Sequence, residues 1–149
     1  MRGEDRGVID SIIRNEEGIL GQMMELRDRS SLSNIIMFLD AFIQSRENTI
    51  RFLRGIESGE EHRGEIRREI KEIGSTEHLA MGDVDPNSLR DTLLFISKLE
   101  EESLRGISEA VGKVSDPGLR RLLEGMLSDR RKVKAKAEHL YHDLIETSY

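Results

Sequence analysis

The chain has 149 residues, of which 36% are hydrophobic and 35% are charged, with a net charge of −6 and no cysteine. A chain of this length is expected to form one domain, residues 1–149, and the lack of cysteine excludes disulfides, iron–sulfur clusters and thiol nucleophiles. The acidic balance argues against nucleic-acid binding, and the charged N-terminus and short apolar runs argue against a signal peptide or a membrane span, so a cytoplasmic protein is expected.

The first predicted helical hairpin covers about residues 8–56. Apolar residues recur every three or four positions in both of its helices, at about 8–27 and about 32–56, which is the spacing of one buried helix face. Serines lie between the two helices and are favourable capping residues there. The pattern therefore predicts two antiparallel helices joined by a short turn.

The second predicted hairpin covers about residues 85–147, after a crossover at about 57–84 whose apolar spacing predicts a short helix through Ile66, Ile70 and Ile73. Asp-Pro occurs twice, at Asp85 and at Asp116, and each pair predicts a helix N-cap followed by the first helical residue. The expected fold is all-α, an up-down bundle of four long helices arranged as two hairpins.

A charged residue interrupts the apolar stripe in each of the four helices. Glu16 and Glu100 interrupt the first and third helices, and Arg46 and Arg130 interrupt the second and fourth. A buried charge is costly unless it is paired, so we expect Glu16 to pair with Arg46 and Glu100 to pair with Arg130. The alternative is that the stripe drifts, so that these four side chains only reach the rim of the bundle.

This layout resembles the ferritin-like superfamily, and in particular the rubrerythrin-type di-iron carboxylate proteins. The third helix of that family carries a glutamate within a phrase like Met-Glu-Glu-Glu-Ser, and here residues 99–103 read Leu-Glu-Glu-Glu-Ser. The fourth helix of the family carries Glu-x-x-His, which places two ligands on one metal. Here Arg130 and Val133 stand at those positions, and Glu-x-x-His occurs nowhere in the chain.

The resemblance therefore implies a ferritin-like bundle that has lost its metal site. We expect no catalytic residue, no cofactor and no metal, and a structural or protein-interaction role rather than an enzymatic one. The alternative is a divergent di-iron oxidoreductase or peroxidase, in which iron would be held by carboxylates of Glu16, Glu47, Glu100 and Asp129.

A third possibility is a helical adaptor that binds an acidic protein partner. It depends on a run of basic residues in the last helix, between Arg120 and Lys136. The resemblance also implies that a homodimer can form, since ferritin-like bundles commonly associate along their long faces. Apolar residues lie partly off the main stripes, and such a second apolar face is covered either by the crossover or by a partner subunit. These residues are Phe38, Phe42, Phe52, Leu94 and Phe95.

Overall fold

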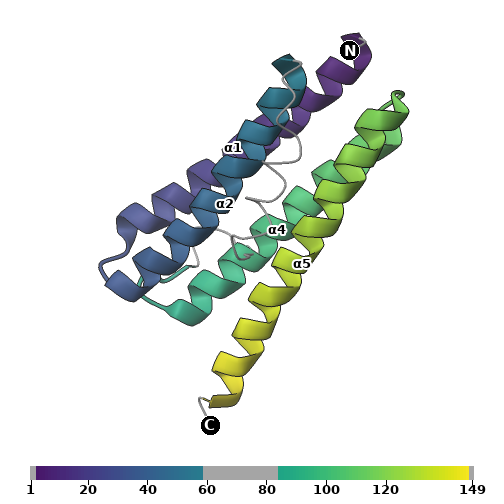
Figure 1. The fold of residues 1–149 in the computed structure, drawn as a ribbon. Coiled ribbons are helices and arrows are strands. Elements are labelled where there is room, and N and C mark those ends of the chain that lie inside the picture. The colour runs from purple at the N-terminus through teal and green to yellow at the C-terminus, as the bar shows by residue number, and fades with distance from the viewer. Residues whose placement is uncertain (1–2, 59–83, 148–149) are drawn as a thin grey trace.

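The computed structural model describes residues 3–58 and 84–147, with side chains up to Asp143. These residues form four helices, α1 (Gly3–Arg29), α2 (Ser33–Ser58), α4 (Leu89–Lys113) and α5 (Pro117–Thr147). α1 packs on α2 and α4 packs on α5, and the two hairpins meet where α1 contacts α4 (Figure 1). The predicted all-α architecture of two hairpins is confirmed, whereas the short helix predicted within the crossover lies outside the described residues. None of the four described helices is long and apolar enough to cross a membrane.

Hydrogen bonds at the two ends of the bundle fix the direction of each helix. Ser31, in the α1–α2 turn, donates from its backbone nitrogen at 2.9 Å and its hydroxyl at 3.1 Å to Asn87, which precedes α4. At the other end, Asp5 near the start of α1 accepts hydrogen bonds from Ser115 in the α4–α5 turn. α1 and α4 are therefore antiparallel, whereas α2 and α4 run in the same direction. α4 begins at the end of the bundle opposite to the end where α2 stops (Figure 1).

Only one of the two Asp-Pro pairs starts a helix in the predicted way. The carboxylate of Asp116 accepts a hydrogen bond from the backbone nitrogen of Leu119 at 2.8 Å, and Pro117 is the first residue of α5. The prediction for Asp85 is wrong. Its carboxylate accepts from the backbone nitrogen of Asn87 and closes a turn, and Ser88 instead caps α4, which begins at Leu89. An aspartate side chain that bonds two residues ahead stabilises a turn rather than a helix N-terminus.

The hydrophobic core consists of two clusters separated along the bundle by a polar layer. The first cluster uses the N-terminal part of α1, the C-terminal parts of α2 and α4, and the first part of α5, with Ile9, Leu53, Ile107 and Leu123 fully buried. The second cluster uses the C-terminal part of α1, the N-terminal parts of α2 and α4, and a later part of α5. It includes Met23, Leu39, Ile96 and Ala137. In every helix the predicted mid-stripe charge lies between the residues of the two clusters.

The apolar residues that lie off the main stripes are largely covered within the single chain. Phe42, Phe52 and Phe95 are buried, and Phe38 packs its ring edgewise against Phe42 at a centroid distance of 4.7 Å. Phe38 and Leu94 are half-buried. These residues therefore leave little apolar surface for a partner subunit.

Candidate functional site

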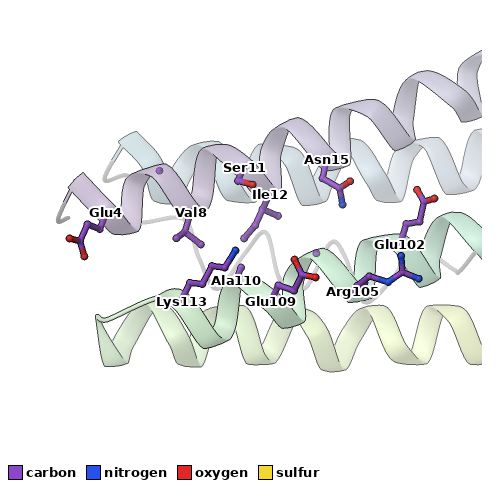
Figure 2. A pocket seen from close by; sticks show the side chains of 12 residues that line it. Glu4, Val8, Ser11, Ile12, Asn15, Glu102, Arg105, Glu109, Ala110 and Lys113 are labelled. Atoms are coloured by element: carbon purple, nitrogen blue, oxygen red, sulfur yellow. The ribbon is translucent and has the colours of Figure 1, made fainter.

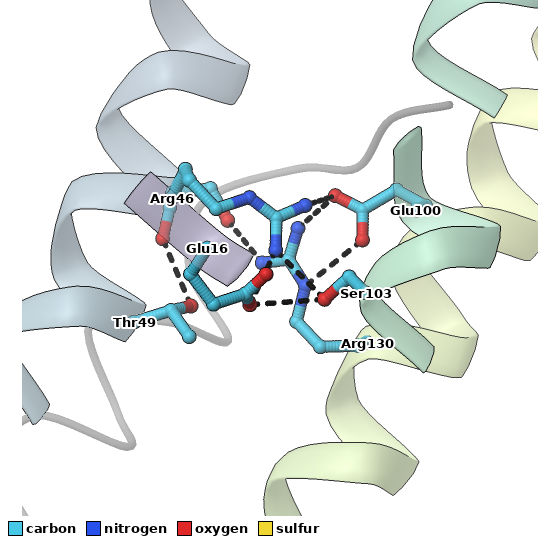
Figure 3. Close-up of polar contacts among 7 residues, drawn as sticks. Glu16, Arg46, Thr49, Glu100, Ser103 and Arg130 are labelled. Atoms are coloured by element: carbon cyan, nitrogen blue, oxygen red, sulfur yellow. Dashed lines mark hydrogen bonds and ion pairs between the residues drawn. The ribbon is translucent and has the colours of Figure 1, made fainter. Parts of the chain in front are cut away.

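The polar layer between the two core clusters is built from one charged residue of each helix. Glu16 comes from α1, Arg46 from α2, Glu100 from α4 and Arg130 from α5, and the side chains of all four have no exposed surface. Their carboxylate and guanidinium groups converge at the centre of the bundle (Figure 3). Two positive and two negative charges are thus enclosed together, and we call these four residues the ion network.

Glu100 is the acceptor that joins the two arginines. Arg130 binds it through two donors, with Nε donating to Oε2 at 3.1 Å and Nη2 donating to Oε1. Arg46 Nη2 donates to the same Oε1 atom from the other hairpin. Two parallel N–H donors of one guanidinium on one carboxylate make a stronger and more directional contact than a single hydrogen bond. Glu100 therefore connects α4 to both α2 and α5.

Glu16 is held by Arg46 and by a serine hydroxyl. Arg46 Nη1 donates to Glu16 Oε1 at 2.6 Å, and Ser103 Oγ donates to the same oxygen at 2.9 Å. Arg46 Nη1 also lies 2.9 Å from Ser103 Oγ, so the hydroxyl accepts from the arginine and donates to the glutamate. On the other side, Arg130 Nη1 donates to Ser45 Oγ at 2.7 Å. Two atoms of the network, Glu16 Oε2 and Arg46 Nε, are buried without a hydrogen-bond partner.

The two guanidinium groups lie side by side but in different electrostatic surroundings (Figure 3). Burial acts to lower the pKa of Arg46, but the carboxylates of Glu100 and Glu16 outweigh it, so the pKa of Arg46 is raised. For Arg130, burial and the positive charge of Arg46 lower the pKa, and Glu100 only partly opposes them. Both groups keep their charge at ordinary pH because a guanidinium is a very strong base.

The structure brings the four charged residues predicted from the sequence together. Each predicted pair is in contact, Glu16 with Arg46 and Glu100 with Arg130, and the two partners are 30 residues apart in both hairpins. None of these side chains reaches the rim of the bundle. The sequence did not predict the contact of Arg46 with Glu100, which converts two separate pairs into one network across both hairpins.

The four carboxylates proposed as iron ligands are not gathered at one point. Glu16 and Glu100 belong to the ion network, whereas Glu47 is exposed and lines a surface groove between α1 and α2. Asp129 is buried, with one carboxylate oxygen lacking a hydrogen-bond partner. Within residues 3–58 and 84–143, no group of three or more histidine and carboxylate side chains could hold a metal ion.

Sequence reasoning missed the polar residues that complete the ion network and fix the end of the bundle. Ser103 follows Glu100 by three positions, which places both on one helix face, so that spacing was an available signal. No sequence signal distinguishes Ser45.

Asp5 lies four residues before Ile9 on the buried stripe, has no exposed surface, and binds the α4–α5 turn through Ser115 and Asp116.

The basic run proposed as a docking patch is smaller than the sequence suggests. Arg130 belongs to the ion network, Arg120 donates to the carbonyl of Val114 at 2.6 Å, and Lys134 pairs with Glu138. The exposed basic side chains that remain on α5 are Arg121, Arg131, Lys132 and Lys136. Binding of an acidic partner by this surface stays a prediction.

The sequence matches no protein-family model, and comparisons with curated proteins and with solved structures give no significant match.

Proposed function

We propose that this chain is a ferritin-like bundle of the rubrerythrin type that holds no metal and acts as a structural or protein-interaction module. The single observation that carries this proposal is the position of the two arginines. Arg46 places its guanidinium group between Glu16 and Glu100, and Arg130 places a second guanidinium group on Glu100. Both lie midway along the helices, where the resemblance locates the two metal ions of the family. A fixed organic cation thus stands in the place that the resemblance assigns to a metal cation.

The residues of the network do not fit a di-iron centre. Such a centre uses about four carboxylates and usually two histidines, all directed inward. Here the inward groups are two carboxylates and two guanidinium groups, and three of the four carboxylate oxygens already accept hydrogen bonds from arginine or serine. Two further cations at this point would lie against two positive charges in a medium of low dielectric constant, which is strongly unfavourable.

Measuring the metal content of the purified protein tests this proposal. The chain is produced in iron-supplemented medium, purified without chelators or a metal-binding tag, and analysed by mass spectrometry. We expect fewer than about one metal ion per ten chains, against about two per chain for a di-iron protein. Iron near two per chain would overturn the proposal and favour the oxidoreductase alternative.

A variant of the same chain provides the matched comparison. Replacing Arg46→Glu and Arg130→Glu together would put four inward carboxylates in the layer, one from each helix. Because carboxylate oxygens are ligands for divalent iron and manganese, this double variant is expected to gain metal that the parent does not bind, and the metal should raise its melting temperature. The exposed double variant Arg54→Glu/Arg121→Glu has the same change in net charge and should gain none.

A further inference from the structure

Two acidic side chains meet where the end of α2 lies against the first half of α1. Asp10 comes from α1 and Glu57 from the last turn of α2, both are half-buried, and their carboxyl groups form a hydrogen bond with each other. Two ionised carboxylates have no hydrogen to donate, so this contact requires that the pair hold one proton. Acidic side chains elsewhere have basic neighbours, as in the groove between α1 and α4, where Glu109 lies between Arg105 and Lys113 (Figure 2).

The nearest described arginines do not bind this carboxyl pair. Arg54, one turn before Glu57 on α2, forms its ion pair with Glu17 at 3.1 Å. Arg6, one turn before Asp10 on α1, is exposed, and both arginines act on Glu57 through electrostatic attraction alone. The Oε2 atom of Glu57 is enclosed and receives no hydrogen bond from any N–H or hydroxyl donor of the described residues. A proton is therefore the cation that this contact uses.

The surroundings of Glu57 favour its protonated form. The hydrogen bond with Asp10 is the largest contribution, followed by burial and by the negative charge of Asp10, and together they outweigh the attraction of Arg54 and Arg6, so the pKa of Glu57 is raised. Glu57 also lies in the last turn of α2, where the partial negative charge of the helix end disfavours a carboxylate. A group whose pKa is higher in the folded chain than in the unfolded chain stabilises the fold at low pH, and this contribution is lost as the pH rises through the folded pKa.

We propose that Asp10 and Glu57 form a proton-dependent latch, which holds the end of α2 against α1 at acidic pH and releases it as the pH rises. The last turn of α2 also contributes Ile56 to the first core cluster, where Ile9 and Ile13 of α1 are buried. Release of the latch therefore loosens the edge of this cluster and leaves the ion network at the centre of the bundle in place. This inference goes beyond the proposed function and does not depend on it.

NMR titration of the full chain tests the latch. The side-chain carboxyl signal of Glu57 gives its titration midpoint, and hydrogen exchange gives protection factors for the amides in the last turn of α2. We expect a midpoint above that of an ordinary glutamate and protection that falls as the pH rises through it. The total fall in protection should be about tenfold for each pH unit by which the midpoint exceeds that of the unfolded chain, so the two measurements check each other.

Two variants separate the latch from a general effect of pH. Glu57→Gln replaces the shared proton with a permanent amide donor, so protection of the last turn should no longer depend on pH and should stay near the acidic value of the parent. Asp10→Asn should lower the midpoint of Glu57, because the amide donates to the ionised carboxylate. Glu47→Gln is the matched control, since Glu47 is exposed in the same groove as Glu57, and it should keep the pH dependence of the parent.

Three results would each overturn the latch. They are an ordinary titration midpoint for Glu57, protection of the last turn that does not change with pH in the parent, and a Glu57→Gln variant that keeps the pH dependence. None of them alters the metal content, so failure of this inference is distinguishable from failure of the proposed metal-free core.

Discussion

Arg130 contacts a carboxylate of α4 and a hydroxyl of α2 from its own position on α5, so one side chain connects three helices. Breaking a buried charge pair by removing one partner costs about 3–5 kcal/mol, because the other charge is left uncompensated. We therefore expect Arg130→Met to lower the free energy of unfolding by about that amount. Urea denaturation monitored by circular dichroism measures it.

The exposed pair of Arg54 with Glu17, at 3.1 Å, is the control for that substitution. Arg54→Met should change the free energy of unfolding by less than about 1 kcal/mol, since exposed ion pairs contribute little. A double-mutant cycle adds a second criterion. Glu100→Gln combined with Arg130→Met should cost less than the sum of the two single changes, because the partners are coupled. A neutral Arg130→Met would show that the pairing contributes nothing to stability.

At the scale of elements, Asp5 attaches the first turn of α1 to the α4–α5 turn. Its carboxylate accepts hydrogen bonds from the backbone nitrogens of Ser115 and Asp116 at 3.0 and 3.1 Å, and from the Ser115 hydroxyl. Asp5→Ala would remove these acceptors and lower the free energy of unfolding by about 2–3 kcal/mol, as expected for hydrogen bonds to a charged group. Denaturant titration of the variant measures this loss.

Asp28 is a suitable control for Asp5, because its side chain is 76% exposed and Asp28→Ala removes the same carboxylate from the other end of α1. Hydrogen exchange gives a local readout. Amide protons near Ser115 should exchange faster in Asp5→Ala, while those in the α1–α2 turn should change only as much as global stability does. Unchanged exchange near Ser115 would contradict the attachment.

At the scale of the whole molecule, the ion network joins two hairpins whose apolar cores lie on either side of it. Arg46 contacts Glu16 within its own hairpin and Glu100 in the other, so it carries the ion pair that joins the two hairpins, beside the hydrogen bonds of Arg130 to Ser45 and of Ser103 to Glu16. We expect Arg46→Met to destabilise both hairpins together, with hydrogen exchange accelerating in α1–α2 and in α4–α5 by a similar factor. Confinement of the effect to α1 and α2 would show that the network does not couple the two halves.

The sequence alone determined the four long helices and placed one charged residue on the apolar stripe of each, but it left open whether these charges lie in the core or at the rim. Apolar spacing of three and four residues predicted four long helices and two hairpins, because a helix repeats its buried face at this interval. The same spacing placed Glu16, Arg46, Glu100 and Arg130 on the inward faces. The first residues of the helices were predicted less well. Asp85 closes a turn instead of capping α4, and Ser88 forms the cap. Neighbouring side chains compete for the free backbone N–H groups, and the sequence does not show which of them forms the cap.

Tertiary structure decided which groups meet. Periodicity fixes the direction in which a side chain points from its helix, but an arginine carries its charge on a long, flexible stem and can reach acceptors on more than one neighbour. The contact between Arg46 and Glu100, the two serines of the network and the attachment of Asp5 to Ser115 all depend on how the hairpins dock. Each of these contacts joins residues of different hairpins, and no local sequence pattern predicts such a contact.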